Sequence, residues 1–124
     1  MAGRGRREAL QAGAEAEDFV AARLVAGGAR VLARRWSGGG GELDLVVERA
    51  GRLRFVEVKA RADDVLDPLE QITPAKQARL VGAARAWLRA HATAATEVAF
   101  LVAVVDLSAE PWQVSWVDDA FDVG

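Results

Sequence analysis

The chain has 124 residues, which is the size of one ordinary domain and too short for two domains with separate cores. Hydrophobic residues make up 52% of the chain and charged residues 27%, a composition that excludes global disorder. The chain contains no cysteine and a single histidine, His91, so disulfides, zinc–thiolate sites and multi-histidine metal centres are excluded. Any catalytic chemistry is therefore expected to rely on carboxylates and lysine.

Charge is distributed unevenly along the chain. The formal net charge is −2, but residues 1–61 carry 12 basic and 8 acidic side chains, whereas the remainder carries 4 and 10. This asymmetry allows a basic face for an anionic polymer such as nucleic acid, although scattered surface charge explains it equally well. Only Lys59 and Lys76 among the 16 basic residues are lysines; either they serve where a compact, titratable charge is needed or they have no special role.

The apolar segments are short. The longest run, residues 98–105, is far below the roughly 20 residues of a membrane helix. No apolar segment follows the N-terminal arginines, so a secretory signal is not expected. The sequence thus predicts a cytoplasmic protein without a membrane partner, and the lack of cysteine suits that reducing compartment.

The first third of the chain predicts one helix and one strand. After a flexible basic segment over residues 1–7, helical periodicity begins near residue 8 and ends at about residue 26, before two glycines. A strand is then expected over residues 30–36, followed by a mobile, glycine-rich loop over residues 37–41.

The rest of the chain completes a sheet and adds a second helix. Four further segments have the character of strands: residues 43–47, 53–58, 98–107 and 112–117. The third of these is apolar on both faces and predicts an interior strand, whereas the last predicts an edge strand. An acidic loop over residues 61–71 precedes a helix over residues 74–90, with Thr73 as its N-cap. The order α-β-β-β-α-β-β predicts a single α/β domain over residues 8–124, with helices flanking a mixed central sheet.

The predicted hairpin of the second and third strands brings charged side chains together. Side chains alternate between the faces of a strand, so Glu42 and Asp44 share one face, as do Glu57 and Lys59. A two-residue turn at positions 50–51 would pair residues whose numbers sum to 101. Asp44 would then lie opposite Glu57, and Glu42 opposite Lys59.

Two adjacent carboxylates in an apolar sheet repel each other, and a divalent cation would relieve that repulsion. Two carboxylates with room for water and phosphate oxygens suit Mg²⁺, with Mn²⁺ as a substitute, better than Zn²⁺. With Lys59 stabilising the attacking water or the developing charge, the pattern favours metal-assisted phosphodiester hydrolysis. The alternative is a structural salt-bridge cluster in which Lys59 neutralises Glu42 and Glu57 at a solvated strand end.

Two more charged residues are expected along buried helix faces. Glu17 precedes Val20 by three residues, and Lys76 precedes Leu80 by four. They either converge with the hairpin residues on one cleft or lie at the edges of apolar stripes with their charged ends in water.

The segments GELDLVV and RFVEVKAR resemble the YraN-type family of small bacterial proteins, which are usually described as endonucleases. The resemblance covers most of the chain, from Gly13 and Glu17 to Ala120 and Phe121. The chain departs from the family pattern at Arg35-Trp36-Ser37 and at Ala99-Phe100-Leu101, where the family usually has Asn-x-Arg and Arg-Phe-Asp. Neither departure touches the carboxylates and the lysine.

This resemblance implies a restriction-endonuclease-like fold of the PD-(D/E)xK superfamily, with a likeness to archaeal Holliday-junction resolvases. It implies that Asp44 and Glu57 are metal ligands and that Lys59 is the catalytic lysine. Glu17 matches an acidic residue of the first helix that binds or orients the metal. A homodimer is expected by analogy, since resolvase-like enzymes pair two active sites to cleave two strands.

Nucleic-acid contacts are expected from basic residues around these positions. The candidates are Lys76, Arg34, Arg35 and Arg61. Trp36, next to two of these arginines, either packs in the core or stacks on a base.

The sequence therefore predicts a Mg²⁺-dependent endonuclease acting on DNA, including branched or structured DNA. A second hypothesis is a non-catalytic nucleic-acid or protein-binding module with the same fold and a degenerate site. A third is a carboxylate-dependent enzyme acting on a small phosphate. Binding by a non-catalytic module would survive removal of Asp44, Glu57 and Lys59, whereas loss of arginines would weaken it.

Overall fold

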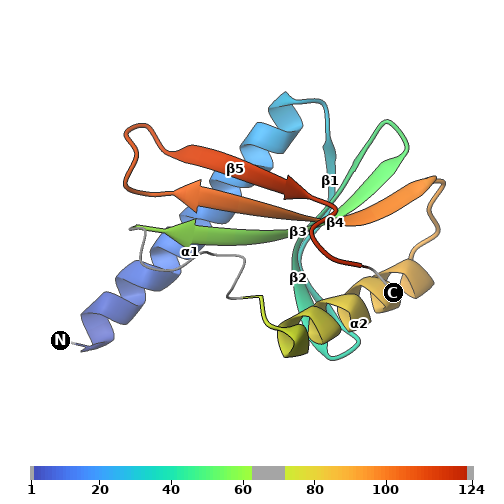
Figure 1. Ribbon diagram of the computed structural model, residues 1–124, viewed down its shortest axis with the longest axis horizontal. Coiled ribbons are helices and arrows are strands. Elements are labelled where there is room, and N and C mark those ends of the chain that lie inside the picture. Colours follow the sequence, from blue (N-terminus) through green and yellow to red (C-terminus); the bar gives the residue numbers. More distant parts are fainter. Residues whose placement is uncertain (1, 63–71, 123–124) are drawn as a thin grey trace.

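The computed structural model describes residues 2–62 and 72–122, with side chains from residue 13 onward in the first helix. Two helices, α1 (Ala2–Ala26) and α2 (Pro74–Ala90), pack against one five-stranded sheet (Figure 1). The strands are β1 (Arg30–Gly38), β2 (Gly41–Arg49), β3 (Arg52–Arg61), β4 (Glu97–Asp106) and β5 (Gln113–Asp118). This is the predicted element order, and it confirms the α/β class.

The sheet follows the chain order β1-β2-β3-β4-β5. Neighbouring strands are antiparallel except β3 and β4, which are parallel because α2 lies in the connection between them. The sheet is therefore mixed, with β4 in the interior and β5 at an edge, as predicted.

The helix boundaries agree with the prediction at α2 and differ at α1. The Thr73 side chain accepts a hydrogen bond from the Lys76 backbone N–H at 3.2 Å, which is the expected N-cap. At the other helix, α1 begins at Ala2, whereas its predicted start was near residue 8. Three of residues 2–7 are arginine, which favours helix, and the helix extends over this stretch even though Gly3 and Gly5 disfavour it. Most of the predicted acidic loop, residues 63–71, lies outside the described residues.

The core consists of two apolar clusters, one on each face of the sheet. Along β4 successive residues alternate between them, with Phe100 and Val102 on the α2 face and Leu101 and Ala103 on the α1 face. The two helices therefore cover opposite faces, and each face of β4 is buried. Neither helix, over the residues that the structure describes, combines the length and apolar character needed to cross a membrane.

The expected mobile loop over residues 37–41 is instead a tight turn between β1 and β2. Gly39 and Gly40 have φ angles of +58° and +85°, which suit glycine in a two-residue hairpin turn. A Cβ atom at Gly39 would lie 2.2 Å from the Gly82 carbonyl oxygen, and one at Gly41 would lie 2.3 Å from that of Arg79. The prediction of mobility was wrong because the backbone of α2 packs directly on this turn. The turn fixes the start of β2 beside the first half of α2.

Candidate carboxylate–lysine site

The hairpin of β2 and β3 has the predicted register. Its turn residues Ala50 and Gly51 have φ angles of +51° and +77°, and pairing runs from Arg49–Arg52 to Leu45–Val56. The backbone pairing of β2 with β3 ends at Leu45 and Val56. The predicted pairs of Asp44 with Glu57 and of Glu42 with Lys59 therefore lie beyond the ladder.

Beyond the ladder, side chains replace the backbone pairing. Asp44 Oδ2 accepts a hydrogen bond from the Val58 backbone N–H at 2.8 Å. The Ser37 hydroxyl donates to Glu42 at 3.5 Å, so the structure does not give Glu42 the expected partner Lys59. The Asp44 carboxylate thus satisfies a backbone donor of β3 and is held close to that strand.

Glu57 is the centre of a small charge cluster. Its residue is only 7% exposed, and its Oε1 atom lies 3.5 Å from Lys59 Nζ and 3.2 Å from Lys76 Nζ. Lys59 comes from β3, two residues further on, whereas Lys76 comes from the first turn of α2, which the Thr73 cap holds in place. Both lysines of the chain therefore contact the same buried carboxylate.

The site perturbs the acidity of its members. Burial, followed by the negative charge of Glu57, raises the pKa of Asp44 to about 7, and the Val58 N–H opposes this only in part. Burial and the neighbouring Lys76 lower the pKa of Lys59. Burial also acts to lower the pKa of Lys76, but hydrogen bonding to Lys59 and the charge of Glu57 outweigh it and raise that pKa. Perturbed groups clustered in a cleft are typical of functional sites.

Glu17 approaches this cluster from α1 but is held by a different partner. Its Oε1 atom lies 3.3 Å from Nε of Arg35, and its charge contributes to the raised pKa of Asp44. Arg35 itself has a φ angle of +48°, a strained conformation for a residue with a side chain. Across the described part of the chain, no group of three or more acidic or histidine residues is arranged to hold a metal ion.

A cavity of about 270 Å³ opens between the hairpin and α2. Its lining includes Asp44, Glu57, Lys76 and Arg79. Arg79, which the sequence pattern did not single out, is an exposed residue that borders this cavity. The signal was available, because Arg79 follows Lys76 by three residues and so lies on the same side of the helix.

The other predicted nucleic-acid contacts lie elsewhere. Arg34 forms an ion pair with Asp18 of α1, just as Arg35 does with Glu17. Arg61 is the last residue of β3, and its carbonyl accepts a hydrogen bond from Leu107. Trp36 is partly buried, and it packs against the α2-face core with its ring edge-on to His91.

The donor set suits Mg²⁺ or Mn²⁺. Mg²⁺ is usually bound by one or two carboxylates together with water and substrate phosphate oxygens. The half-buried Asp44 and the buried Glu57 supply two carboxylates whose mutual repulsion a divalent cation would relieve. The residues of this cavity include no histidine and no thiolate, the ligands that zinc prefers.

Comparison with known proteins places the chain among bacterial relatives of undescribed activity. The model of the uncharacterised protein family UPF0102 matches residues 16–123. A UPF0102 protein of Bradyrhizobium sp. (strain ORS 278) is 46% identical over 83 residues, which are 67% of this chain and 58% of the relative. A UPF0102 protein of Rhodopseudomonas palustris (strain BisB18) is 48% identical over 83 residues, covering 67% and 61% of the two chains. The match thus spans about three fifths of the length of these relatives.

Proposed function

The chain belongs to the uncharacterised protein family UPF0102, and we propose that it is a metal-dependent endonuclease that hydrolyses phosphodiester bonds in DNA. The observation that carries this proposal is a small polar cavity lined by Asp44, Glu57 and Lys76, together with Lys59, which pairs with the buried Glu57 carboxylate. Burying an acidic pair costs stability, which is expected where the pair serves chemistry. The resemblance of GELDLVV and RFVEVKAR to the YraN-type family, whose members are usually described as endonucleases, supports the same conclusion.

In this proposal Asp44 and Glu57 hold Mg²⁺ or Mn²⁺, which supplies charge stabilisation for the phosphodiester when bound. Water attacks phosphorus, one P–O ester bond breaks, and the products are a phosphate monoester and a free hydroxyl. Lys59, whose pKa is lowered, donates a hydrogen bond to the attacking water and stabilises the negative charge that develops on the phosphate oxygens. Lys76 holds the Glu57 carboxylate in position, and Glu17 orients the acidic pair from α1.

The substrate class follows from the charges around the cavity. Lys76 and Arg79 lie at the edge formed by α2 and provide positive charge next to the carboxylates. Such an edge suits the phosphate backbone of a polymer, and the resemblance to resolvases favours DNA, including branched DNA. We expect a homodimer when both strands are cut, since each protomer contributes one site.

One observation favours a second candidate, a non-catalytic nucleic-acid or protein-binding module. Lys59 and Lys76 already neutralise Glu57, so the cluster is satisfied in part as a structural salt bridge. In that case the site would stabilise the packing of α2 on the hairpin, and binding would depend on arginines instead.

Cleavage of labelled DNA distinguishes the two candidates. Duplex, single-stranded and four-way-junction substrates are incubated with Mg²⁺, with Mn²⁺ or with EDTA, using the wild type, Asp44→Asn and Lys59→Met. Glu110→Gln, at an exposed carboxylate remote from the cavity, is the matched control. We expect metal-dependent cutting that falls by about 100-fold or more in both site variants and is unchanged in the control.

Other outcomes are equally informative. If the wild type is inert and binds DNA as tightly as both site variants do, the nuclease proposal fails and the binding module replaces it. Cutting that persists undiminished in both site variants also rejects the proposal, because it assigns the activity to a contaminating nuclease.

A further inference from the structure

A second cavity, of about 710 Å³, lies on the α1 face of the sheet, away from the carboxylate–lysine site on the α2 face. It opens beside the C-terminal end of α1 and against the strand ends of β2, β3 and β5. Its polar and aromatic lining consists of Arg23, Arg49, Arg52, Arg54, Trp116 and Asp118. Four arginines thus face one aspartate, and the volume lies within the range of small-molecule binding sites.

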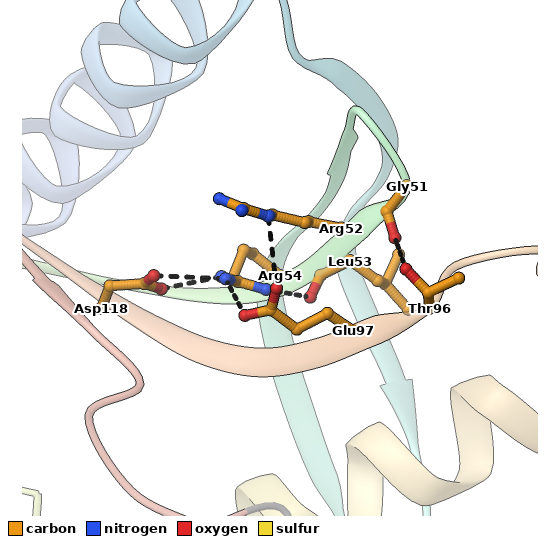
Figure 2. Close-up of polar contacts among 7 residues, drawn as sticks. All are labelled: Gly51, Arg52, Leu53, Arg54, Thr96, Glu97 and Asp118. Carbon is orange, nitrogen blue, oxygen red and sulfur yellow. Dashed lines mark hydrogen bonds and ion pairs between the residues drawn. The ribbon is translucent and has the colours of Figure 1, made fainter.

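Two of these arginines are already matched by carboxylates, as Figure 2 shows. Arg54 Nε lies 2.7 Å from Asp118 Oδ1, and Arg54 Nη2 lies 2.8 Å from Glu97 Oε1. Arg52 Nε lies 3.2 Å from the other oxygen of Glu97. Arg54 is almost fully buried, and its bonds tie β3 to β4 and β5. This network therefore forms a fixed polar wall of the cavity.

The other two arginines are available to a ligand. Among the side chains that the structure describes, neither Arg23 nor Arg49 contacts a carboxylate. The Arg23 guanidinium lies over the Phe19 ring, 4.8 Å from its centre. The backbone carbonyls of Arg23 and Leu24 at the end of α1 accept hydrogen bonds from the backbone N–H groups that follow. These carbonyls therefore do not require the side chains of Arg23 and Arg49 as donors. Two unmatched cations thus border the cavity.

An exposed aromatic ring lines the same cavity as these cations. Trp116 is 42% exposed and belongs to β5, where it pairs with Ala103 of the α1 face. Two residues further along the same strand, Asp118 is anchored to Arg54, which holds this end of β5 against the sheet. An indole on a fixed strand offers a flat surface for stacking.

We propose that this cavity binds a nucleotide unit, with its phosphate on Arg23 and Arg49 and its base stacked on Trp116. Guanidinium groups bind phosphate through charged hydrogen bonds, and bases stack on exposed aromatic side chains without regard to sequence. The unit comes either from a free mononucleotide or from a strand of nucleic acid that runs over the α1 face. The site uses none of the residues of the proposed nuclease, so it stands or falls independently of that activity.

Binding is measured in EDTA, which prevents cleavage, with two probes: dAMP by calorimetry and a fluorescein-labelled 12-nucleotide oligo-dT by anisotropy. The variants are Arg49→Gln and Trp116→Leu, and Arg89→Gln, an exposed arginine on α2, is the matched control. Circular dichroism confirms that each variant is folded. We expect both cavity variants to weaken binding by about tenfold or more, and the control to bind as the wild type does.

The two probes separate the sources of the nucleotide. Binding of dAMP that both cavity variants weaken supports a site for free nucleotides. Binding of the oligonucleotide alone, weakened in the same variants, supports a track for a nucleic-acid strand. The proposal is overturned if neither probe binds, or if Arg49→Gln and Trp116→Leu bind as tightly as Arg89→Gln does.

Discussion

At the scale of single residues, ionisation of the Asp44 carboxyl group destabilises the folded protein, so the free energy of unfolding depends on pH. Its pKa is about 7 in the folded protein against an ordinary value of 3.8. Between these values the folded state keeps a proton that the unfolded state has released, so stability falls as pH rises from about 4 to 7. Asp44→Asn removes this titration and keeps an oxygen that can accept the Val58 N–H. We expect the variant to be more stable than the wild type by more than about 1 kcal/mol at pH 8.

Urea denaturation in EDTA at pH 4, 6 and 8 measures this difference, with Glu110→Gln as the control. The gain in stability should shrink toward pH 4, where both states of the wild type become protonated. A variant that is less stable than the wild type at pH 8 would contradict the prediction, because it would mean that the Asp44 charge is well compensated.

The residues of the site differ in how readily the sequence reveals them. Asp44 and Glu57 could be predicted because strand alternation and a two-residue turn are local rules. The arginine network around Arg54 could not, since its partners Glu97 and Asp118 are 43 and 64 residues away. Long side chains reach partners that depend on how whole strands pair, which no local pattern encodes.

At the scale of elements, the turn between β1 and β2 determines where the acidic strand begins. Gly39 and Gly40 both have positive φ, but only Gly39 is pressed against α2. A Cβ at Gly39 would lie 2.2 Å from the Gly82 carbonyl oxygen, whereas nothing lies within 4 Å of one at Gly40. We expect Gly39→Ala to destabilise the protein by at least about 2 kcal/mol and Gly40→Ala by about 1 kcal/mol.

The pair Gly39→Ala and Gly40→Ala separates backbone strain from helix packing, since both positions carry the strain and only one carries the clash. Chemical denaturation of the two variants gives both free energies. Equal losses in the two variants would show that α2 does not press on the turn. If the nuclease proposal holds, Gly39→Ala should also reduce cleavage more than Gly40→Ala, because it displaces β2 from α2.

The same turn shows which features of the secondary structure the sequence could not predict. The sequence predicted the α2 boundaries, because Thr73 and Pro74 are strong start signals. It suggested a mobile loop at residues 37–41, because consecutive glycines usually indicate freedom. The close approach of Gly82 to Gly39 joins positions 43 residues apart, and only the packed structure shows it.

At the scale of the whole molecule, the two faces of the sheet separate two kinds of polar site. The α2 face holds the acidic pair with both lysines, whereas the α1 face holds the arginine-lined cavity with Trp116. Charge asymmetry along the sequence allowed a basic face, but the fold divides the basic residues between the two cavities, with Lys76 and Arg79 at one and four arginines at the other. A cation and a nucleotide would therefore bind at separate places, and their effects on global unfolding can be measured independently.

The last prediction concerns a divalent cation and the unfolding of the entire domain. If Asp44 and Glu57 hold Mg²⁺, binding to the folded state alone raises the free energy of unfolding by RT ln(1 + [Mg²⁺]/Kd), about 1.4 kcal/mol at ten times Kd. For a domain of this size, that corresponds to a rise of a few degrees in Tm. Asp44→Asn and Glu57→Gln should lose this rise, and Glu110→Gln should keep it.

Differential scanning calorimetry at pH 8 measures the rise, with NaCl at matched ionic strength to remove general screening. Because Lys59 and Lys76 contact the same oxygen of Glu57, a bound cation must compete with two ammonium groups, which makes millimolar affinity the expected range. Lys76→Met should therefore strengthen the response to Mg²⁺ even though it removes an ion pair. An identical rise in the wild type and in Asp44→Asn would place the cation elsewhere and would remove the acidic pair from the proposed chemistry.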